Sequence, residues 1–416
     1  MLLTTTIPCH LSKSDADALN RASGEVYTRV VVTHWRAYRN CRHWLSPSGA
    51  ERLDDWYAKQ DAKKPPCILH SHSIDAAQHG FYKPVKTART NRKEGNVQNA
   101  RFPHKRKYYR STIWKNTGIR FLGTQMLLSR ARGLPAVRVE FSTKGIVKEV
   151  GLVYDLKQKE YFWHIVVEDG IVPTPVIGGN TAAIDMGEIH PIAITDGEQV
   201  CIMSCRQLRS VAQGTNKGLA ELQLKLSSCT KESRRWRRLR RAQRKMFAQR
   251  KRRQRDLLHK VSHATIQWCK ERNIGTLAIG DVRNVADKTK VDHRLNSKVR
   301  QKISNWPHGM LRQYLGYKAE RAGIGVHDDV PEPHTSQTCL KCRHRYKPKG
   351  RTYSCTNKLC DFVFPRDGVG GANILSRFLY GELARVLPTQ VKYRHPSLMG
   401  KRSRADTTEI AAYFCK

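Results

Sequence analysis

The 416-residue chain carries 76 Lys and Arg residues against 35 Asp and Glu residues, a formal net charge of +41. Such an excess opposes compaction unless a polyanion is bound, so we expect nucleic acid as the partner. The sequence has no run of about 18 apolar residues, which argues against a membrane protein. Its start does not resemble a secretory signal, so we expect the twelve cysteines to be reduced thiols or metal ligands in an intracellular protein.

The first half of the chain is predicted to combine helix with antiparallel β-structure. Residues 4–11 alternate weakly like a strand, and residues 15–42 repeat apolar side chains at helical intervals behind a Ser12 or Ser14 cap. Residues 43–125 are polar and basic with few strand signals, and we expect loops at 65–66 and 86–107. Three alternating segments between 136 and 168 predict antiparallel hairpins. The Pro- and Gly-containing stretch 172–180 predicts a domain boundary.

The second half reads as buried strands alternating with helices. Strands are predicted within 182–198, at 275–282 and at 324–332, and helices at 206–272, at 302–323 and from 366. This alternation predicts a mixed or parallel α/β sheet. Residues 388–416 are basic and aperiodic, so we expect a loose tail there.

A cysteine cluster follows the last predicted strand. Two short pairs stand twelve residues apart, Cys339 with Cys342 and Cys355 with Cys360. Two chelating pairs can surround one ion tetrahedrally, and the polar segment between them has no apolar face on which to fold without a metal. The spacing predicts one structural Zn²⁺ held by four thiolates.

Two carboxylates lie at the edges of the predicted α/β core. Asp185 ends a short apolar strand, and Asp367 stands at the start of the last helix, where it could also act only as a cap. A carboxylate in such a place costs free energy unless a cation or several donors face it. Metal ions that cleave phosphodiesters are held by several converging carboxylates, so the two acids suggest a magnesium site.

A basic run without any acid spans residues 233–255. On a helix its cations would occupy every face, so ion pairs within the helix cannot offset their repulsion. We expect Trp236, Leu239, Met246 and Phe247 to dock this helix. We expect its cations to contact RNA or an RNA–DNA duplex, in particular Arg234, Arg235, Arg237, Arg238, Arg240, Arg241, Arg244, Lys245, Arg252 and Arg253.

Read together, six segments resemble the TnpB family of transposon-encoded RNA-guided DNA nucleases, which is related to type V CRISPR effectors. They occur in the order of the family and cover about 180–380 of the chain: AAIDMGEIHPIAITDG, RRQRDLLHKVSHATIQWCKERNI, LAIGDV, QKISNWPHGMLRQYLGYKAERAGI, HTSQTCLKC and RDGVGGANIL.

The resemblance implies an α/β RNase H-like (RuvC) nuclease domain with a zinc-ribbon insertion. It also implies an N-terminal β-barrel-like wedge domain interrupted by a helical recognition lobe. The wedge would comprise 1–12 and 126–175, and the lobe 13–125. The nuclease would comprise 180–332 and 362–387, the zinc finger 333–361, and the basic tail 388–416.

The resemblance also implies the catalytic residues. Asp185 matches the aspartate of the family's first strand, and Asp367 matches that of its final Arg-Asp motif. The family's usual second acid is a glutamate at the end of the strand 275–282, but this chain has Gly280 and Asp281 there. Glu332 ends the next predicted strand, 324–332. This strand should lie beside the strand 275–282 at a distance of about 5 Å, so we expect Glu332 to supply the second acid. Asp281 is the alternative ligand.

The expected function is RNA-guided cleavage of target double-stranded DNA by a transposon protein, with two catalytic Mg²⁺ and one structural Zn²⁺. We expect a guide RNA as partner, a monomer with one RNA, no membrane, and a place near the nucleoid of a bacterial or archaeal cytoplasm. Two alternatives stay open: a nuclease-impaired RNA-guided DNA-binding protein or repressor, and a zinc-ribbon RNA-binding protein without activity.

Overall fold

A computed structural model describes residues 2–60, 67–95, 99–156, 158–283, 296–396 and 411–412. The chain forms two compact units, Met1–Ile171 and Val172–Lys416. The loop predicted at 65–66 lies outside the described residues. None of the helices in the described ranges combines the length and the apolar character that crossing a bilayer requires.

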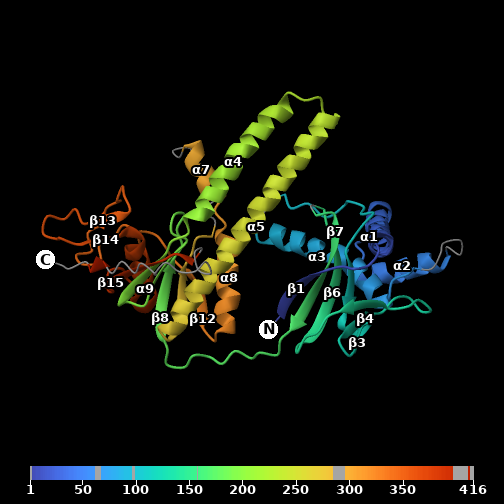
Figure 1. Cartoon of the computed structure of the whole chain (residues 1–416), viewed down its shortest axis with the longest axis horizontal. Coiled ribbons are helices and arrows are strands. Elements are labelled where there is room, and N and C mark those ends of the chain that lie inside the picture. Colours follow the sequence, from blue (N-terminus) through green and yellow to red (C-terminus); the bar gives the residue numbers. More distant parts are fainter. Residues whose placement is uncertain are drawn as a thin grey trace. The chain divides into compact units, whose positions relative to one another are not determined.

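In the described part of the first unit, two antiparallel sheets share one core (Figure 1). The first sheet contains, in spatial order, β1 (Leu2–Pro8), β7 (Glu160–Glu168), β6 (Ile146–Asp155) and β2 (Thr112–Lys115). The second contains β3 (Ile119–Leu122), β4 (Gln125–Leu128) and β5 (Val137–Glu140), with the 3₁₀ turn Asn116–Gly118 joining β2 to β3.

The predicted hairpins are confirmed in part. β6 and β7 form the expected hairpin, but β5 pairs with β4 and not with β6. The alternation of β5 predicted a half-buried strand but not its partner. Val137 and Val139 pack in a core that both sheets share, so their burial does not show which sheet the strand joins. Within 43–125, where few strand signals were found, the structure has the two short strands β2 and β3.

Helices complete the first unit. α1 (Lys13–Cys41) begins as predicted at Ser12, whose hydroxyl accepts a hydrogen bond from the backbone N–H of Asp15 at 3.1 Å. α2 (Pro47–Gln60) and α3 (Ser71–Lys93) follow. The loop predicted from residue 86 is wrong up to Lys93, because α3 buries Phe81, Val85 and Ala88 at helical spacing.

The second unit is built on one mixed sheet. Its described strands are, in spatial order, β12 (Gly325–Val330), β11 (Ile274–Gly280), β8 (Asn180–Asp185), β9 (Ile192–Thr195), β10 (Gln199–Met203), β15 (Gln390–Arg394) and β16 (Ala411–Ala412). β8, β11 and β12 run parallel to one another, so the mixed α/β sheet and the neighbouring position of the strand near 324–332 are confirmed. The loose tail was wrong for 390–394, because β15 pairs in parallel with β10.

Each face of this sheet is covered by helices (Figure 1). Ala182 and Ile184 of β8 pack with α8 (His308–Arg321) and with the second half of α5 (Arg234–Glu271). Ala183, one position out of phase, packs with α9 (Arg366–Tyr380) and with the hairpin of β13 (Thr352–Ser354) and β14 (Val363–Pro365). Because side chains alternate along a strand, Asp185 lies on the α9 side.

Two predicted helices are interrupted. Residues 206–272 form α4 (Arg206–Ser227) and α5, an antiparallel pair that extends beyond the sheet (Figure 1). The break ends at Ser233, whose hydroxyl caps α5 by accepting from the N–H of Trp236 at 3.2 Å. The helix predicted at 302–323 is α7 (Ser297–Ser304) followed by α8, because Pro307 cannot continue the first helix.

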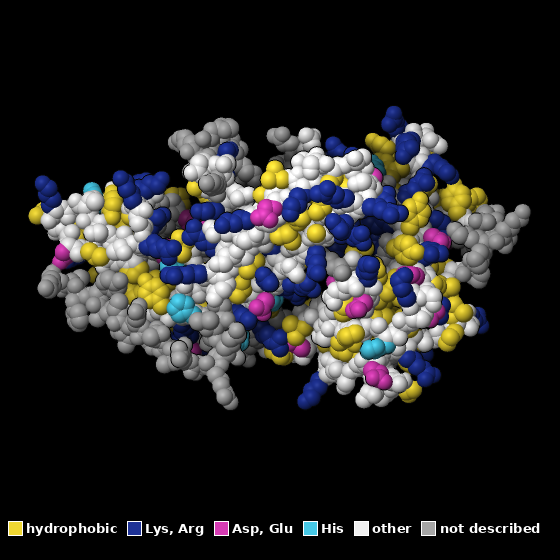
Figure 2. Space-filling view, turned by 45° about the horizontal axis from the view of Figure 1, so that its top comes forward, with side chains coloured by type: hydrophobic (Ala, Val, Ile, Leu, Met, Phe, Trp, Pro, Cys, Tyr) yellow, Lys and Arg dark blue, Asp and Glu magenta, His cyan; other side chains and the backbone are white. Residues whose placement is uncertain are grey.

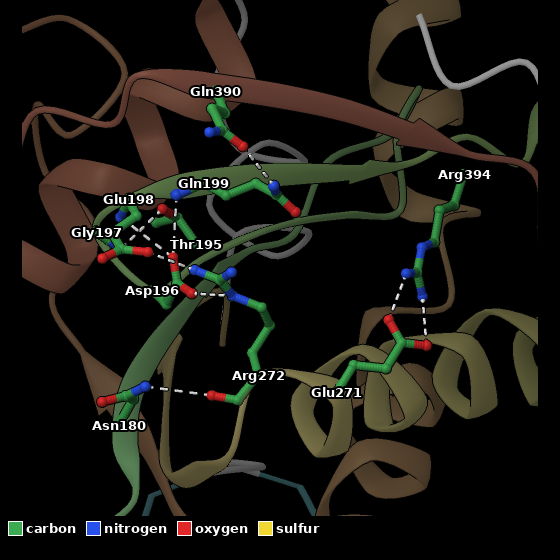
Figure 3. Close-up of polar contacts among 10 residues, drawn as sticks. All are labelled: Asn180, Thr195, Asp196, Gly197, Glu198, Gln199, Glu271, Arg272, Gln390 and Arg394. Atoms are coloured by element: carbon green, nitrogen blue, oxygen red, sulfur yellow. Dashed lines mark hydrogen bonds and ion pairs between the residues drawn. The ribbon is translucent and has the colours of Figure 1, made fainter. Parts of the chain in front are cut away.

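Arginine bridges tie α5 to the end of the sheet where β8 begins (Figure 3). Arg272, which follows α5, donates to Asp196 at 2.5 Å and to Glu198 at 2.7 Å, and its carbonyl accepts from the Asn180 amide at 3.2 Å. Arg394, the last residue of β15, pairs with Glu271 of α5 (Figure 3). The carboxylates of Asp196 and Glu198, at the end of the sheet where β8 begins, therefore have a guanidinium partner.

Candidate active site

At the opposite end of the sheet, parallel strands bring acids together. Asp185 is the last residue of β8, Asp281 follows β11 directly, and Glu332 stands two residues after β12. The carboxyl ends of parallel strands share one edge of a sheet, which is where ligands bind in α/β folds. All three acids, together with Asp367 of α9, line one cavity of about 590 Å³.

α9 passes directly over Asp185. A Cβ at Gly370 would lie only 2.2 Å from Oδ2 of Asp185, so a larger residue there would displace the carboxylate. Asp367 stands three residues earlier on the same helical face. Burial raises the pKa of Asp185 well above its usual range, and the carboxylates of Glu332 and Asp367 raise it further against the opposing charge of Arg366.

Glu332 fills the space left by Gly280. A Cβ at Gly280 would lie 2.2 Å from Oε1 of Glu332 and 2.9 Å from its Cδ. The carboxylate of Glu332, which comes from another chain segment, thus occupies the space that a side chain at position 280 would take. Burial, reinforced by the Asp281 carboxylate, raises the pKa of Glu332 to about 7, and Oε1 is buried without a hydrogen-bond partner in the described structure.

Asp281 lines the same cavity, but its carboxylate is paired with arginine side chains. Its two oxygens accept from Nε and Nη2 of Arg283 at 2.8 and 3.0 Å, and the backbone N–H of Arg283 adds a third bond at 2.9 Å. Nη1 of Arg312 lies 3.9 Å from Oδ1 of Asp281. The Arg283 hydrogen bonds lower the pKa of Asp281, so this carboxylate is charged but already neutralised by neighbouring cations.

The donor set fits a hard divalent cation. Such ions take carboxylate oxygens, and a cation would relieve both the repulsion between these acids and the cost of burying Glu332. Within the described residues, the cysteine cluster is the group of three or more potential ligands found close enough together to hold one ion, and the acids do not form such a group.

The four predicted zinc ligands are together. The sulfur atoms of Cys339, Cys342, Cys355 and Cys360 all lie within 4.8 Å of one another. The distance is 3.8 Å between Cys339 and Cys360, and 3.5 Å between Cys342 and Cys355. Four sulfurs at a Zn–S distance of about 2.3 Å are separated by about 3.8 Å in a tetrahedron, so the cluster fits a structural zinc ion.

The basic run forms the first half of α5. All ten cations singled out in the sequence are exposed there, and few Asp or Glu side chains lie among the Lys and Arg side chains of the visible face (Figure 2). Trp236, Leu239 and Met246 form a partly buried stripe as expected. Phe247 does not belong to it, because its side chain is 50% exposed.

Three residues that shape the site were not identified as such from the sequence. Gly370 makes room for Asp185, and Gly280 makes room for Glu332. His190 contacts Asp367 through a 2.7 Å hydrogen bond. A glycine in place of the family's glutamate was the only signal for any of them.

Comparisons with known proteins agree with this architecture. Residues 164–286 match the family OrfB_IS605, described as a probable transposase, and residues 308–374 match the Cas12f1-like TNB domain. Over these segments the chain is similar to the TnpB/OrfB_IS605 family. A TnpB-like protein of Methanocaldococcus jannaschii is 26% identical over 172 residues, which cover 41% of this chain and 57% of that relative. The chain thus spans little more than half of its length.

Solved structures show the same fold. A Cas12f1 in a complex with sgRNA and target DNA has a TM-score of 0.60 at 12% identity, covering 87% of this chain and 83% of that one. The mini-RNA-guided endonuclease CRISPR-Cas_phi3 has a TM-score of 0.54 at 11% identity, covering 93% and 94%. CasPhi-2 bound to crRNA has a TM-score of 0.52 at 9% identity, covering 93% and 99%. The chain therefore has a Cas12f-like fold with a RuvC part and a zinc-finger region.

Proposed function

We propose that this protein is an RNA-guided DNA endonuclease in which Asp185, Glu332 and Asp367 hold two Mg²⁺. These carboxylates would hold the ions, whose chemistry when bound would be activation of water and stabilisation of the leaving 3′ oxygen in phosphodiester hydrolysis. The carboxylates orient the ions and take no proton themselves. Arg351 and Arg366 line the same cavity and suit the phosphate of a DNA strand.

One observation carries the assignment of the second acid. Oε1 of Glu332 is buried without a hydrogen-bond partner in the described structure, directly over Gly280 and on the strand edge of Asp185. A buried carboxylate in this state is costly unless a ligand compensates it. Asp281 has its cation partners already, which makes it the weaker candidate.

The partners follow from the relatives and from charge. Named relatives are bound to guide RNA, and one also to target DNA. The exposed cations of α5 would bind the phosphates of the guide RNA or of its duplex with the target, and this binding should weaken steeply with salt. In the first unit, we propose a wedge of residues 1–12 and 126–175 and a recognition lobe of residues 13–125. The zinc finger (333–361) would be inserted between the nuclease segments 180–332 and 362–387.

The alternative is a nuclease-impaired RNA-guided DNA-binding protein. It is favoured by Gly280, which leaves the family's usual position without a carboxylate. The shared cavity of Asp185, Glu332 and Asp367 supports the nuclease over this alternative and over a non-enzymatic zinc-ribbon protein.

The decisive experiment starts with RNA that co-purifies with the full-length protein. Sequencing this RNA identifies the guide, and a plasmid with the matching target is then incubated with the complex and Mg²⁺. We expect target cleavage that EDTA abolishes. Binding of the target without any cut strand would favour the DNA-binding protein, and the absence of a defined RNA would contradict both readings.

A further inference from the structure

His190 connects the two chain segments that carry the first and the last of the proposed acids. It lies between β8 and β9, five residues after Asp185, and only 9% of it is exposed. Its Nδ1 stands 2.7 Å from Oδ2 of Asp367, at the start of α9. The bond therefore bridges the edge of the sheet and the helix that covers it.

The surroundings hold the imidazole in place. A Cβ at Gly187 would lie 2.8 Å from the carbonyl oxygen of His190, so this glycine permits the tight turn that brings the histidine back toward the site. The ring of Tyr393 packs edge-to-face against the imidazole, with ring centres 6.2 Å apart. A ring confined in this way loses little additional freedom when it forms a hydrogen bond.

The chemistry of the pair gives the bond a direction. An ionised carboxylate can only accept, so Nδ1 of His190 carries the hydrogen and donates it to Oδ2. In the described structure no hydrogen bond to Oδ1 of Asp367 is found. One oxygen is thus occupied by the histidine, which sets the rotation of the carboxylate, while the other is left for a ligand.

We propose that His190 is a positioning residue that orients Asp367 for binding a divalent cation. This inference rests on the proposed function, because it assigns a supporting role at the same site. Groups that orient metal ligands by a hydrogen bond typically contribute about 10- to 100-fold to metal affinity or activity. His190 would act through Asp367 and would not touch the metal or the DNA.

The test uses two matched variants of the full-length protein with its co-purified RNA. His190→Leu removes the donor and keeps an apolar side chain, whereas His190→Asn offers a side-chain N–H close to the position of Nδ1. Hydrogen exchange of a peptide that contains residues 366–372 is followed as Mg²⁺ is added, and cleavage is measured over the same concentrations. The exchange measurement reports metal binding at the site without relying on activity.

We expect His190→Leu to raise the Mg²⁺ midpoint of protection, and of cleavage, by about tenfold. His190→Asn should restore most of the affinity. A merely structural role would change the exchange of this peptide without Mg²⁺ and leave the midpoint unchanged. In an Asp367→Asn background, His190→Leu should produce no further shift, because the two residues act through one bond.

The outcomes separate this inference from the proposed function. An unchanged midpoint in His190→Leu would overturn the positioning role while the wild type still cleaves. The same shift in both variants would attribute the effect to ring packing and would also overturn it. A wild-type protein without a Mg²⁺-dependent change in exchange or any cleavage would contradict the proposed function itself.

Discussion

The two ends of the sheet in the second unit treat carboxylates in opposite ways. Where β8 begins, Asp196 is only 3% exposed in its side chain but is paired with Arg272 (Figure 3). Where β8 ends, Asp185 and Glu332 have no ion pair within the described residues, and burial raises the pKa of both. A buried acid beside a cation has its charge compensated, whereas a buried acid without one costs free energy until a ligand binds.

Whether a carboxylate has a cation partner depends on the individual residue and not on the end of the sheet at which it lies. Asp281 lies at the carboxyl end of β11, yet Arg283 binds it as tightly as Arg272 binds Asp196. The comparison therefore separates acids without a cation partner from paired acids even inside one cavity. Substitutions at these positions test the distinction between paired and unpaired acids.

The largest effect is expected for Glu332→Ala. If Glu332 holds a metal ion, its loss should lower the rate of target cleavage by more than about a thousandfold, because the transition state loses electrostatic stabilisation. Asp281→Ala, the matched control, should lower it by no more than about tenfold, since its charge is already paired. Both variants should bind target DNA like the wild type in a mobility-shift assay. The reverse ranking would make Asp281 the second acid.

A relocated acid should recover part of this loss. Gly280→Glu alone should be strongly impaired, because its Cβ would meet the Glu332 carboxylate at 2.2 Å. Combined with Glu332→Ala, the new glutamate gains the vacated space, and we expect about tenfold or more of the lost cleavage rate to return. Gly280→Gln in the same background is the control for size without charge. Equal rates for the two double variants would show that no carboxylate is required there.

At the paired end, Arg272→Ala should destabilise the protein. It leaves the buried Asp196 carboxylate without its cation, and removing one partner of such a pair costs about 3 kcal/mol in the free energy of unfolding. Urea unfolding checks this value, and Asp196→Asn combined with Arg272→Ala should lose less than Arg272→Ala alone. A loss below about 0.5 kcal/mol would assign the pair to ordinary surface interactions.

The smallest effect has the opposite sign. Glu332→Gln removes a buried carboxylate that lacks a cation, so without divalent ions it should raise the free energy of unfolding by about 1 kcal/mol at neutral pH. Added Mg²⁺ should stabilise the wild type and not this variant, because only the charged side chain binds the ion. Thermal unfolding with and without Mg²⁺ measures both. Destabilisation by Glu332→Gln without metal would contradict the comparison.

Local patterns predicted the parts of the site that are close in sequence. The cysteine spacing predicted the cluster Cys339–Cys360, which forms because each pair needs only one turn to face a common ion. The resemblance to the TnpB family indicated Asp185 and Asp367, and the expected neighbouring strand indicated Glu332. The structure brings all three to one cavity. Their catalytic role stays a prediction.

Long-range pairing was less predictable. The alternation of residues 137–140 predicted a strand but not its pairing with β4, and the basic segment near 388 concealed β15. Charge and alternation are properties of one segment. The partner of a strand depends on which apolar faces are buried together in the folded chain, and one segment alone does not show this.

Composition and spacing predicted a nucleic-acid-binding α/β protein with a zinc-binding cluster, and six ordered segments gave the resemblance to the TnpB family. Arg283 is only two residues from Asp281, but the other relations join distant segments: Glu332 lies over Gly280, and His190 lies against Asp367. These long-range relations arise only when the chain folds, and they decide the site because the free energy of a carboxylate is set by the burial and charge around it.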